Sequence, residues 1–378
     1  MKTISRRHAL QHLAAATASI GLPALAQVDR RIVLGQSAAF SGPAAQLGIQ
    51  MNRGAKLYFD SVNAAGGVNG AQIELRTMDD MYEPDRCKAN TEALIKDDVF
   101  ALFGYVGTPT SLAALPLVNQ SKMPFFGPFT GAEALRDPFS RYVFHVRASY
   151  YDETALIVKQ LTQLNLKKIA VFRQNDSYGQ AGYDGVVRAL KALNLEPVAV
   201  GLVERNTVEV SAAVQTIVPQ QPDAVVQISA YKSCAAFIRE ARKAGYGGTF
   251  YNVSFVGTQA LADELGRQAM GVVVSQVMPF PFSLTTPISR EYLAAVQKAG
   301  GDNKPNYSSM EGYVAAKLFT EGLKRAGKAP SRDSLINALE SVQSLDLGGF
   351  VVGYGARNHV ASRFVDLSML TDDGRVRV

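Results

Sequence analysis

Histidine and cysteine, the residues most often used in metal sites and nucleophilic catalysis, are scarce in this sequence. It contains four histidines and two cysteines among 378 residues, and two of the histidines precede Ala26. Only His145 and His359 remain, which nearly excludes a histidine-based metal site and a histidine-based catalytic triad. Cys87 and Cys234 lie in no recognisable nucleophile context. They fall in different halves of the chain, each on a predicted helix, and we expect two unpaired, packed thiols.

Sequence signatures of nucleotide and metal binding are missing as well. There is no Walker A motif, no G-x-G-x-x-G and no G-x-S-x-G, and the glycines of residues 179–185 have the wrong spacing for a dinucleotide loop. The acidic loop Asp79–Asp85 lacks the spacing of an EF-hand, so we interpret it as a solvated loop. The sequence therefore predicts no catalytic residues, no bound metal and no cofactor.

Charge runs and long apolar stretches are absent too. After Ala26 no stretch reaches the roughly 18 consecutive apolar residues that a membrane helix needs, so we expect no membrane span in the mature chain. Removal of the segment 1–26 takes away three of the 39 basic and none of the 33 acidic residues, which leaves a net charge of +3. No basic patch is interleaved with aromatic residues, and a nucleic-acid partner is not expected.

The N-terminal segment 1–26 has the composition of a secretory signal peptide. A basic head in residues 2–7 precedes the apolar segment 13–25, and a small-x-small cleavage signal ends at Ala26. We therefore predict export to the periplasm, with cleavage after Ala26. Ser5–Leu10 resembles the twin-arginine export motif, with Ala9 where that motif usually has Phe, so the choice between export routes stays open.

Strands and helices alternate through the rest of the chain. This alternation predicts an α/β fold with parallel sheets that carry helices on both faces. The predicted strands are 31–35, 72–78, 99–103, 124–126, 141–146, 168–172, 197–203, 224–228, 249–253, 272–278, 351–352 and 364–370. The predicted helices are 48–65, 84–96, one that begins after 108, 152–164, one that ends at 193, 210–218, 232–244, 259–265, 289–299, 308–326 and 331–341.

Predicted helix N-caps recur directly after the ends of predicted strands. After the buried strand Val99–Phe103, Thr108 is predicted to be a helix N-cap with Pro109 at the first helical position. Such a helix would point free N–H groups and the positive end of its dipole at a ligand. Further capping boxes are predicted at Thr130–Glu133 and Ser177–Gln180. Ligands of parallel sheets bind beyond the C-terminal ends of the strands, so we expect two lobes with a ligand between them. The candidate residues at that edge are Thr108, Thr130, Ser177, Tyr178, Tyr231 and Ser254.

Several motifs resemble the type I periplasmic binding proteins, in particular the leucine/isoleucine/valine-binding proteins of ABC transporters. The resemblance covers about residues 30 to 375, and its motifs are GQSAAFSGPAAQLG (35–48), NAAGGVNG (63–70), Asp79-Asp80, GYVGT (104–108), NDSYG (175–179) and FIREARKAG (237–245). It implies two Rossmann-like lobes of the Venus-flytrap type, joined by three hinge crossovers. We expect lobe 1 to comprise 30–148 plus about 279–355, and lobe 2 to comprise 149–278 plus about 356–378. At the first crossing we expect Arg147 to form a structural ion pair.

The resemblance also implies ligand-binding residues in both lobes. In lobe 1, Thr108 beside Gly107 would hold a carboxylate, the loop of Phe129, Thr130 and Gly131 would hold the polar end of the ligand, and Leu47 would pack on it. In lobe 2, Tyr178 and Tyr231 would close over the ligand, and Ser254 lies where amino-acid binders place a Glu for the ammonium group.

Two departures from the family pattern bear on the ligand. Ser254 cannot neutralise an ammonium group, and Gly131 occupies the usual Thr position, next to Thr130. An amide or an aromatic carboxylate fits these departures at least as well as an amino acid. Tyr82 replaces a Cys that some relatives use for a disulfide, which agrees with two unpaired thiols.

Three functions remain open at this point. The first is an exported solute-binding protein that captures a branched-chain amino acid, or a related amide or carboxylate, for the permease subunits of an ABC transporter. The second is a ligand sensor of the same fold, for amides or aromatic acids, that acts on a receptor or regulator. The third is an exported α/β enzyme, which the scarcity of catalytic residues disfavours.

Overall fold

The computed structural model describes residues 30–378, so the predicted signal peptide and its cleavage site lie outside the described residues. The first of its two large sheets has five strands in the order β2-β1-β3-β4-β5. The pairs β1/β3, β3/β4 and β4/β5 are parallel. The strands are β1 (Arg30–Ala38), β2 (Ala71–Asp79), β3 (Ala101–Phe103), β4 (Phe125–Phe126) and β5 (Val143–Phe144).

The second sheet has seven strands in the order β14-β13-β10-β9-β8-β6-β7. Strands β6 to β10 pair in parallel, whereas β13 is antiparallel to both β10 and β14. The strands are β6 (Ile169–Gln174), β7 (Val200–Val203), β8 (Ala224–Ile228), β9 (Thr249–Asn252), β10 (Val273–Gln276), β13 (Asp366–Leu370) and β14 (Val376–Arg377). A small hairpin is formed by β11 (Leu345–Asp346) and β12 (Val351–Val352).

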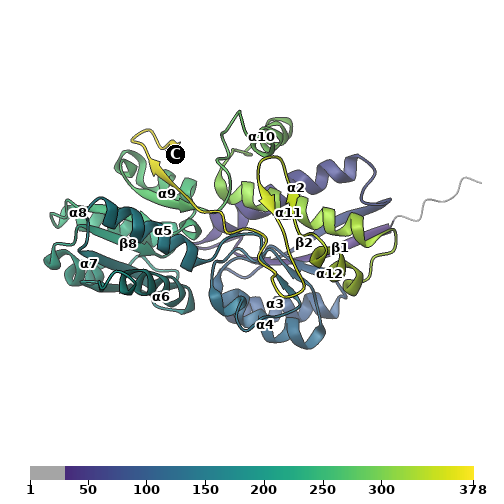
Figure 1. Cartoon of the computed structure of the whole chain (residues 1–378), viewed down its shortest axis with the longest axis horizontal. Helices are drawn as coiled ribbons and strands as arrows, with labels where there is room; N and C mark the ends of the chain where they lie inside the picture. Colours follow the sequence, from purple (N-terminus) through teal and green to yellow (C-terminus); the bar gives the residue numbers. More distant parts are fainter. Residues whose placement is uncertain (1–29) are drawn as a thin grey trace, which may run out of the picture. The chain divides into compact units, whose positions relative to one another are not determined.

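Helices surround each sheet, as Figure 1 shows. The first group is α2 (Ala45–Ala64), α3 (Pro84–Lys96), α4 (Thr108–Ser121), α10 (Pro287–Ala299), α11 (Tyr307–Ala326) and α12 (Arg332–Glu340). The second group is α5 (Tyr150–Gln163), α6 (Ser177–Lys191), α7 (Ser211–Ile217), α8 (Tyr231–Lys243) and α9 (Thr258–Leu265). Short 3₁₀ turns are η1 (Glu133–Leu135), η2 (Val218–Gln220), η3 (Ser254–Val256) and η4 (Gly266–Ala269).

Small residues allow α2 and α11 to approach closely. A Cβ atom on Gly54 would lie 1.8 Å from the carbonyl oxygen of Ser309, and one on Gly312 would lie 2.1 Å from that of Met51. No larger side chain fits at either position. This contact attaches α11, from the C-terminal part of the chain, to the first sheet.

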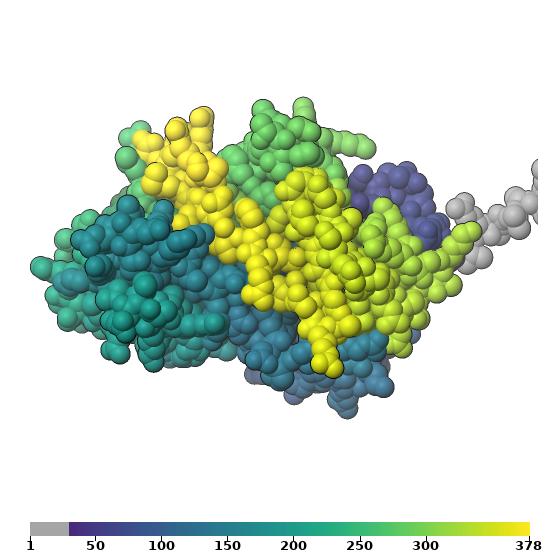
Figure 2. Space-filling view, in the orientation of Figure 1, coloured from purple at the N-terminus to yellow at the C-terminus, as the bar shows by residue number. Residues whose placement is uncertain are grey.

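The chain passes between the two sheets three times, after β5, after β10 and after β12. The first and third crossings lie side by side, because the N–H of His145 donates to the carbonyl of His359 at 2.7 Å and the N–H of Ala361 donates to His145 at 2.8 Å. Figure 2 shows the third crossing as a yellow band on the surface. Residues 31–378 form one compact unit. The two parallel-sheet lobes predicted from the sequence are confirmed, while the lobe boundaries stay a prediction.

The strand order places a crevice in each lobe. In the first sheet the order reverses between β1 and β3, and in the second it reverses between β6 and β8. Loops that leave neighbouring parallel strands in opposite directions open a crevice at the C-terminal edge of the sheet. The connections after β1, β3, β6 and β8 therefore border two crevices of the same topology, and Leu47, Thr108, Tyr178 and Tyr231 follow these strands. Phe129 to Gly131 follow β4 and Ser254 follows β9, the next strand in each sheet.

The element predictions need small corrections at their ends. Helix 84–96 has the predicted bounds, but α2 begins at Ala45 rather than 48, and the strands predicted at 99–103 and 141–146 shorten to β3 and β5.

Both cysteines are buried and unpaired, as predicted. The hydroxyl of Thr91 donates to the carbonyl of Cys87 at 2.7 Å, and the thiol of Cys234 donates to the carbonyl of Ser229 at 3.4 Å. Burial raises the pKa of both thiols far above the ordinary value, so neither is a ready nucleophile.

Candidate ligand-binding site

Thr108 and Thr130 face each other at the C-terminal edge of the first sheet. Their hydroxyl oxygens are 2.6 Å apart, and both side chains are buried. Because Thr108 uses its hydroxyl in this pair, it does not cap the helix, and the prediction of an N-cap there is wrong. The N-cap of α4 is Gly107, with a φ of 105° that favours glycine, and Thr108 is the first helical residue.

The predicted capping box at Thr130–Glu133 is also wrong. The N-cap of η1 is Ala132, which makes no side-chain cap. Thr130 Oγ1 instead accepts a hydrogen bond from the N–H of Ala132 at 3.2 Å and donates to the hydroxyl of Tyr150 at 3.4 Å. The hydroxyls of Thr108, Thr130 and Tyr150 therefore form one buried chain.

The ring of Tyr150 accounts for the glycine at position 131. Tyr150 was not predicted from the sequence to be a site residue. A Cβ atom on Gly131 would lie 2.6 Å from ring atom Cδ1 of Tyr150 and 2.7 Å from its backbone nitrogen. Tyr150 is the first residue of α5, held there by a capping box between Ser149 and Asp152. Its ring fills the space that a threonine at position 131 would need.

Tyr178 contributes an aromatic ring from the second lobe. The N-cap of α6 is Asp176, whose carboxylate accepts from the N–H groups of Tyr178 at 2.9 Å and Gly179 at 3.3 Å, so the predicted capping box at Ser177–Gln180 is wrong. The hydroxyl of Tyr178 is buried and has no hydrogen-bond partner in the described part of the chain. Burial raises the pKa of this phenol well above its ordinary value.

Phe255, on η3, lies at the centre of the aromatic side chains. Its ring centroid is 4.6 Å from that of Tyr178, 5.6 Å from that of Phe129 and 5.9 Å from that of Tyr82. Tyr82 also packs against Gly107, where an added Cβ would lie 2.2 Å from its ring. Neither Phe255 nor Tyr82 was predicted from the sequence to be a site residue. The available signal for Phe255 was its position directly after Ser254, at the end of β9.

Leu47 and Tyr231 lie where the two lobes meet. The Tyr231 hydroxyl accepts from the N–H of Gln46 at 3.5 Å, and a Cβ on Gly257 would lie 2.5 Å from Leu47. A surface pocket borders this contact and is lined by Gly42, Ala45, Gln46, Tyr231, Lys232, Ala260, Asp263 and Glu264. Tyr231 therefore joins the two lobes at the edge of this surface pocket.

Arg147 forms the predicted ion pair, and it does so with two partners. Its Nη2 lies 3.3 Å from Glu153 Oε1, and its Nη1 lies 3.6 Å from Glu311 Oε1. Nη2 also donates to the hydroxyl of Ser254. The guanidinium carbon lies 4.9 Å from the ring centroid of Phe129, in cation–π geometry. Arg147 thus contacts both Ser254 and Phe129, two of the predicted ligand-binding residues.

The charged groups around Arg147 shift one another's pKa values. Burial opposes the charge of Arg147, but Glu311 and Glu153 outweigh it and raise the pKa of the guanidinium. Burial also raises the pKa of Glu311 to about 7, with Arg147 opposing and Glu153 adding to the shift. Burial lowers the pKa of Arg136 to about 10. The cluster therefore joins two arginines to a carboxylate, Glu311, whose charged form burial disfavours.

Polar contacts also join the lobes beside the aromatic cluster. Arg205 lies 2.9 Å from Glu83 Oε2 and 3.4 Å from Asp176 Oδ2. Asn206 donates to Glu83 Oε1 at 2.7 Å and to the carbonyl of Met81 at 3.1 Å. Glu83 is the N-cap of α3 in the first lobe, so its bonds with Arg205 and Asn206 of the second lobe hold the lobes together.

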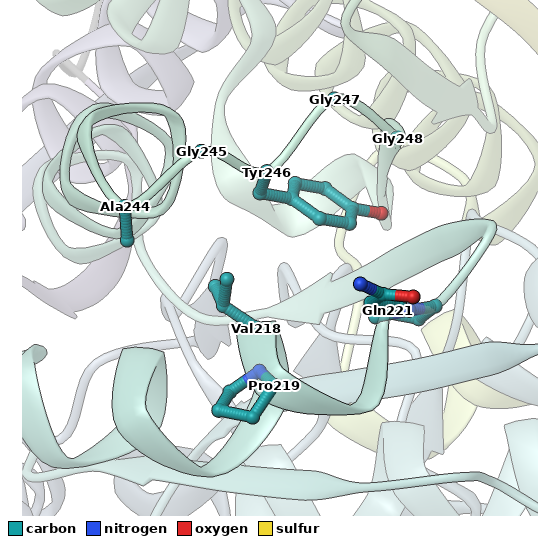
Figure 3. A pocket seen from close by; sticks show the side chains of 9 residues that line it. Val218, Pro219, Gln221, Ala244, Gly245, Tyr246, Gly247 and Gly248 are labelled. Carbon is teal, nitrogen blue, oxygen red and sulfur yellow. The ribbon is translucent and has the colours of Figure 1, made fainter.

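Another surface pocket lies at the opposite edge of the second sheet. Figure 3 shows the ring of Tyr246 over Val218, Pro219 and Gln221 in this pocket. Its loops precede β8 and β9, whereas Tyr231 and Ser254 follow those strands. It is therefore separate from the candidate site.

Residues 30–378 contain neither a membrane-spanning helix nor a cluster of metal-ligating side chains. No helix in this range is long and apolar enough to cross a membrane. No group of three or more His, Cys, Asp or Glu side chains in the same range is placed to hold a metal ion.

Two α/β lobes that face each other with hydroxyl and aromatic side chains define a two-lobed ligand-binding protein. The sequence matches the periplasmic binding protein family over residues 31–375, and the chain belongs to that family. The family consists of binding proteins rather than enzymes, and they are the solute-binding components of ABC transporters.

Individual relatives agree with this assignment. The chain is 25% identical to Leu/Ile/Val-binding protein homolog 7 of Brucella suis, over 97% of this chain and 95% of that protein. A possible leucine/isoleucine/valine-binding protein from Rhodopirellula baltica is 35% identical, with a TM-score of 0.89 over 92% of this chain and 96% of that one. A substrate-binding periplasmic protein from Ralstonia solanacearum is 30% identical, with a TM-score of 0.87 over 91% of this chain and 99% of that one.

Proposed function

We propose that this protein, exported to the periplasm, captures a small carboxylate, amide or amino acid between its lobes and delivers it to the permease subunits of an ABC transporter. The observation that carries the proposal is the convergence of Thr108 and Thr130 from one lobe with Tyr178 and Phe255 from the other. Tyr150 links the two pairs, because its hydroxyl accepts from Thr130 and its ring centroid lies 5.4 Å from that of Tyr178. These side chains provide hydroxyl groups at one end and aromatic faces around them.

The order of binding follows from how the groups are distributed. The N-terminus of α4 and the hydroxyls of Thr108 and Thr130 belong to the first lobe, so a polar ligand end binds there first. Closure then adds Tyr178, Phe255 and Tyr231 from the second lobe. A ligand that contacts both lobes shifts the open–closed equilibrium towards the closed state.

A thermal-shift screen tests the proposal. The panel contains branched-chain and aromatic amino acids, short amides, urea, and aliphatic and benzoate-type acids. A ligand well above its Kd raises the melting temperature by mass action. Titration calorimetry on a hit should then show that Thr108→Ala weakens binding by about 1–3 kcal/mol, because a buried ligand group loses its partner. Thr216→Ala, at an exposed helix hydroxyl, is the matched control.

Two outcomes would contradict different parts of the proposal. A panel and a cell extract that both leave the melting temperature unchanged would contradict solute capture itself. A hit whose affinity is unchanged in Thr108→Ala would place the ligand elsewhere. The sensor function remains the second candidate, and loss of uptake on deletion of the gene would decide for transport.

A further inference from the structure

Arg147 has more hydrogen-bonding capacity than its neighbours use. It is the largest of the fully buried side chains in the described range. Nη2 is occupied by Glu153 and Ser254. Nη1 lies 3.6 Å from Glu311 Oε1, an ion pair without a hydrogen bond, and Nε has no hydrogen-bond partner among the described residues. Buried cationic N–H groups without an acceptor are costly. This arrangement fits an acceptor supplied by a ligand.

The guanidinium of Arg147 borders the candidate site. The guanidinium lies over the ring of Phe129, and its charge acts on the hydroxyls of Tyr150 and Tyr178. The Tyr178 hydroxyl is likewise buried without a partner in the described part of the chain. The ring centroid of Tyr178 lies 5.4 Å from that of Tyr150, whose hydroxyl belongs to the chain through Thr130 to Thr108. Charged and neutral donors thus gather at one end of the aromatic cluster.

The acidic side chains nearby are already engaged. Glu153 Oε2 accepts from the N–H of Ser254 at 2.7 Å and from the hydroxyl of Ser275 at 2.6 Å, and Oε1 accepts from Ser254 Oγ at 3.0 Å. Glu311 is paired with Arg147. A ligand ammonium group would therefore meet a guanidinium, while both of these carboxylates are held by other partners.

We propose that Arg147 makes this site selective for carboxylic acids that carry no ammonium group and have an aromatic or branched apolar body. The carboxylate accepts hydrogen bonds from Arg147, Tyr178 and the threonine hydroxyls, and the apolar body packs against the cluster of Phe129, Phe255 and Tyr82. An α-amino acid of the same shape is rejected by charge repulsion. The inference rests on the proposed function and narrows its ligand class.

Matched ligand pairs test this selectivity on the purified protein by titration calorimetry. The pairs are 3-phenylpropanoate with L-phenylalanine and 4-methylpentanoate with L-leucine, which differ only by the α-ammonium group. We expect at least one acid to bind at least 100-fold more tightly than its amino acid. The amide 3-phenylpropanamide should bind at least tenfold more weakly than its acid. An amino acid or an amide that binds as tightly as its acid would overturn the inference.

Variants separate a role in ligand selection from a role in the fold. Arg147→Gln should weaken acid binding at least tenfold and bring the acid-to-amine ratio below ten, while Arg147→Lys, which keeps the charge, should retain a preference for the acid. Arg188→Gln removes an arginine that stacks on Tyr151 and should leave the ratio unchanged. If Arg147→Gln fails to fold, the wild-type ratio and Arg147→Lys still decide.

The remaining outcomes distinguish this inference from the proposed function. If no acid binds but another solute does, the inference is wrong and the solute-binding function stands. If neither the panel nor a cell extract contains a ligand, solute capture is contradicted as well.

Discussion

Gly131 and the ring of Tyr150 compete for one space, since a Cβ atom on the glycine would lie 2.6 Å from the ring. We expect Gly131→Ala to lower the free energy of unfolding by about 1–3 kcal/mol, because the added methyl group forces Tyr150 or its helix to move. Urea denaturation measures this change.

Gly247→Ala is the matched control for that substitution. A Cβ atom there meets no heavy atom within 4 Å, so the free energy of unfolding should stay within about 0.5 kcal/mol of the wild-type value. Equal losses in both variants would mean that the contact with Tyr150 is not the cause.

Much of the fold could be predicted from local sequence patterns. The helix Pro84–Lys96 has its predicted bounds because Pro84 suits the first turn, and the alternation of strands and helices indicated parallel sheets. The ends of short strands such as β5 were less predictable, because its two residues are fixed by pairing with β4 rather than by their own pattern.

The candidate site was only partly predictable, for a physical reason. Thr108 and Thr130 were found as capping residues, but they pair with each other, and Gly107 and Ala132 occupy the cap positions. Whether a threonine hydroxyl bonds to its own helix or to a residue distant in the sequence depends on the tertiary structure. Nothing local in the sequence indicates that Phe255 meets Tyr82, because their contact joins two lobes.

Tyr178 provides a way to separate a ligand contact from a fold contact. Its hydroxyl is buried without a partner in the described range, so Tyr178→Phe should leave the free energy of unfolding unchanged or raise it by up to about 1 kcal/mol. The same variant should weaken ligand binding by about 1 kcal/mol, roughly fivefold in Kd. Denaturation and titration calorimetry measure the two effects.

Tyr354→Phe is the control for Tyr178→Phe. The Tyr354 hydroxyl is also buried without a partner among residues 30–378, but it packs beside Phe126 and Phe144 in the first lobe. Removal of this hydroxyl should lower neither the free energy of unfolding nor the affinity for the ligand. Lost stability with unchanged affinity in Tyr178→Phe would assign that hydroxyl to the fold.

The ion pair of Arg205 with Glu83 crosses between the lobes and should bias them towards closure, while Asp176 holds the arginine from within the second lobe. The arginine is a quarter exposed, so we expect a contribution of about 0.2–1 kcal/mol, which salt screens. Arg205→Ala should therefore raise the ligand Kd by about 1.4- to 5-fold at low salt and by less at about 0.5 M NaCl. Arg325→Ala, which removes a pair with Glu321 within α11, should leave Kd unchanged. A Kd that is unaltered at low salt would show that these bonds do not stabilise the closed state.

Glu311 should make stability depend on pH. Its pKa is raised from 4.5 to about 7, with burial as the main cause, so the folded protein keeps a proton that the unfolded chain releases. The resulting stabilisation is complete below pH 4.5 and is lost as the pH rises through 7. Glu311→Gln cannot titrate and resembles the protonated acid. Its stability relative to wild type should therefore rise, by on the order of 2 kcal/mol, between pH 5 and pH 8. Urea denaturation across this range measures the difference, and the exposed Glu209→Gln should show no such trend. Parallel pH profiles for wild type and Glu311→Gln would mean that Glu311 is ionised throughout and that Arg147 is fully neutralised without a ligand.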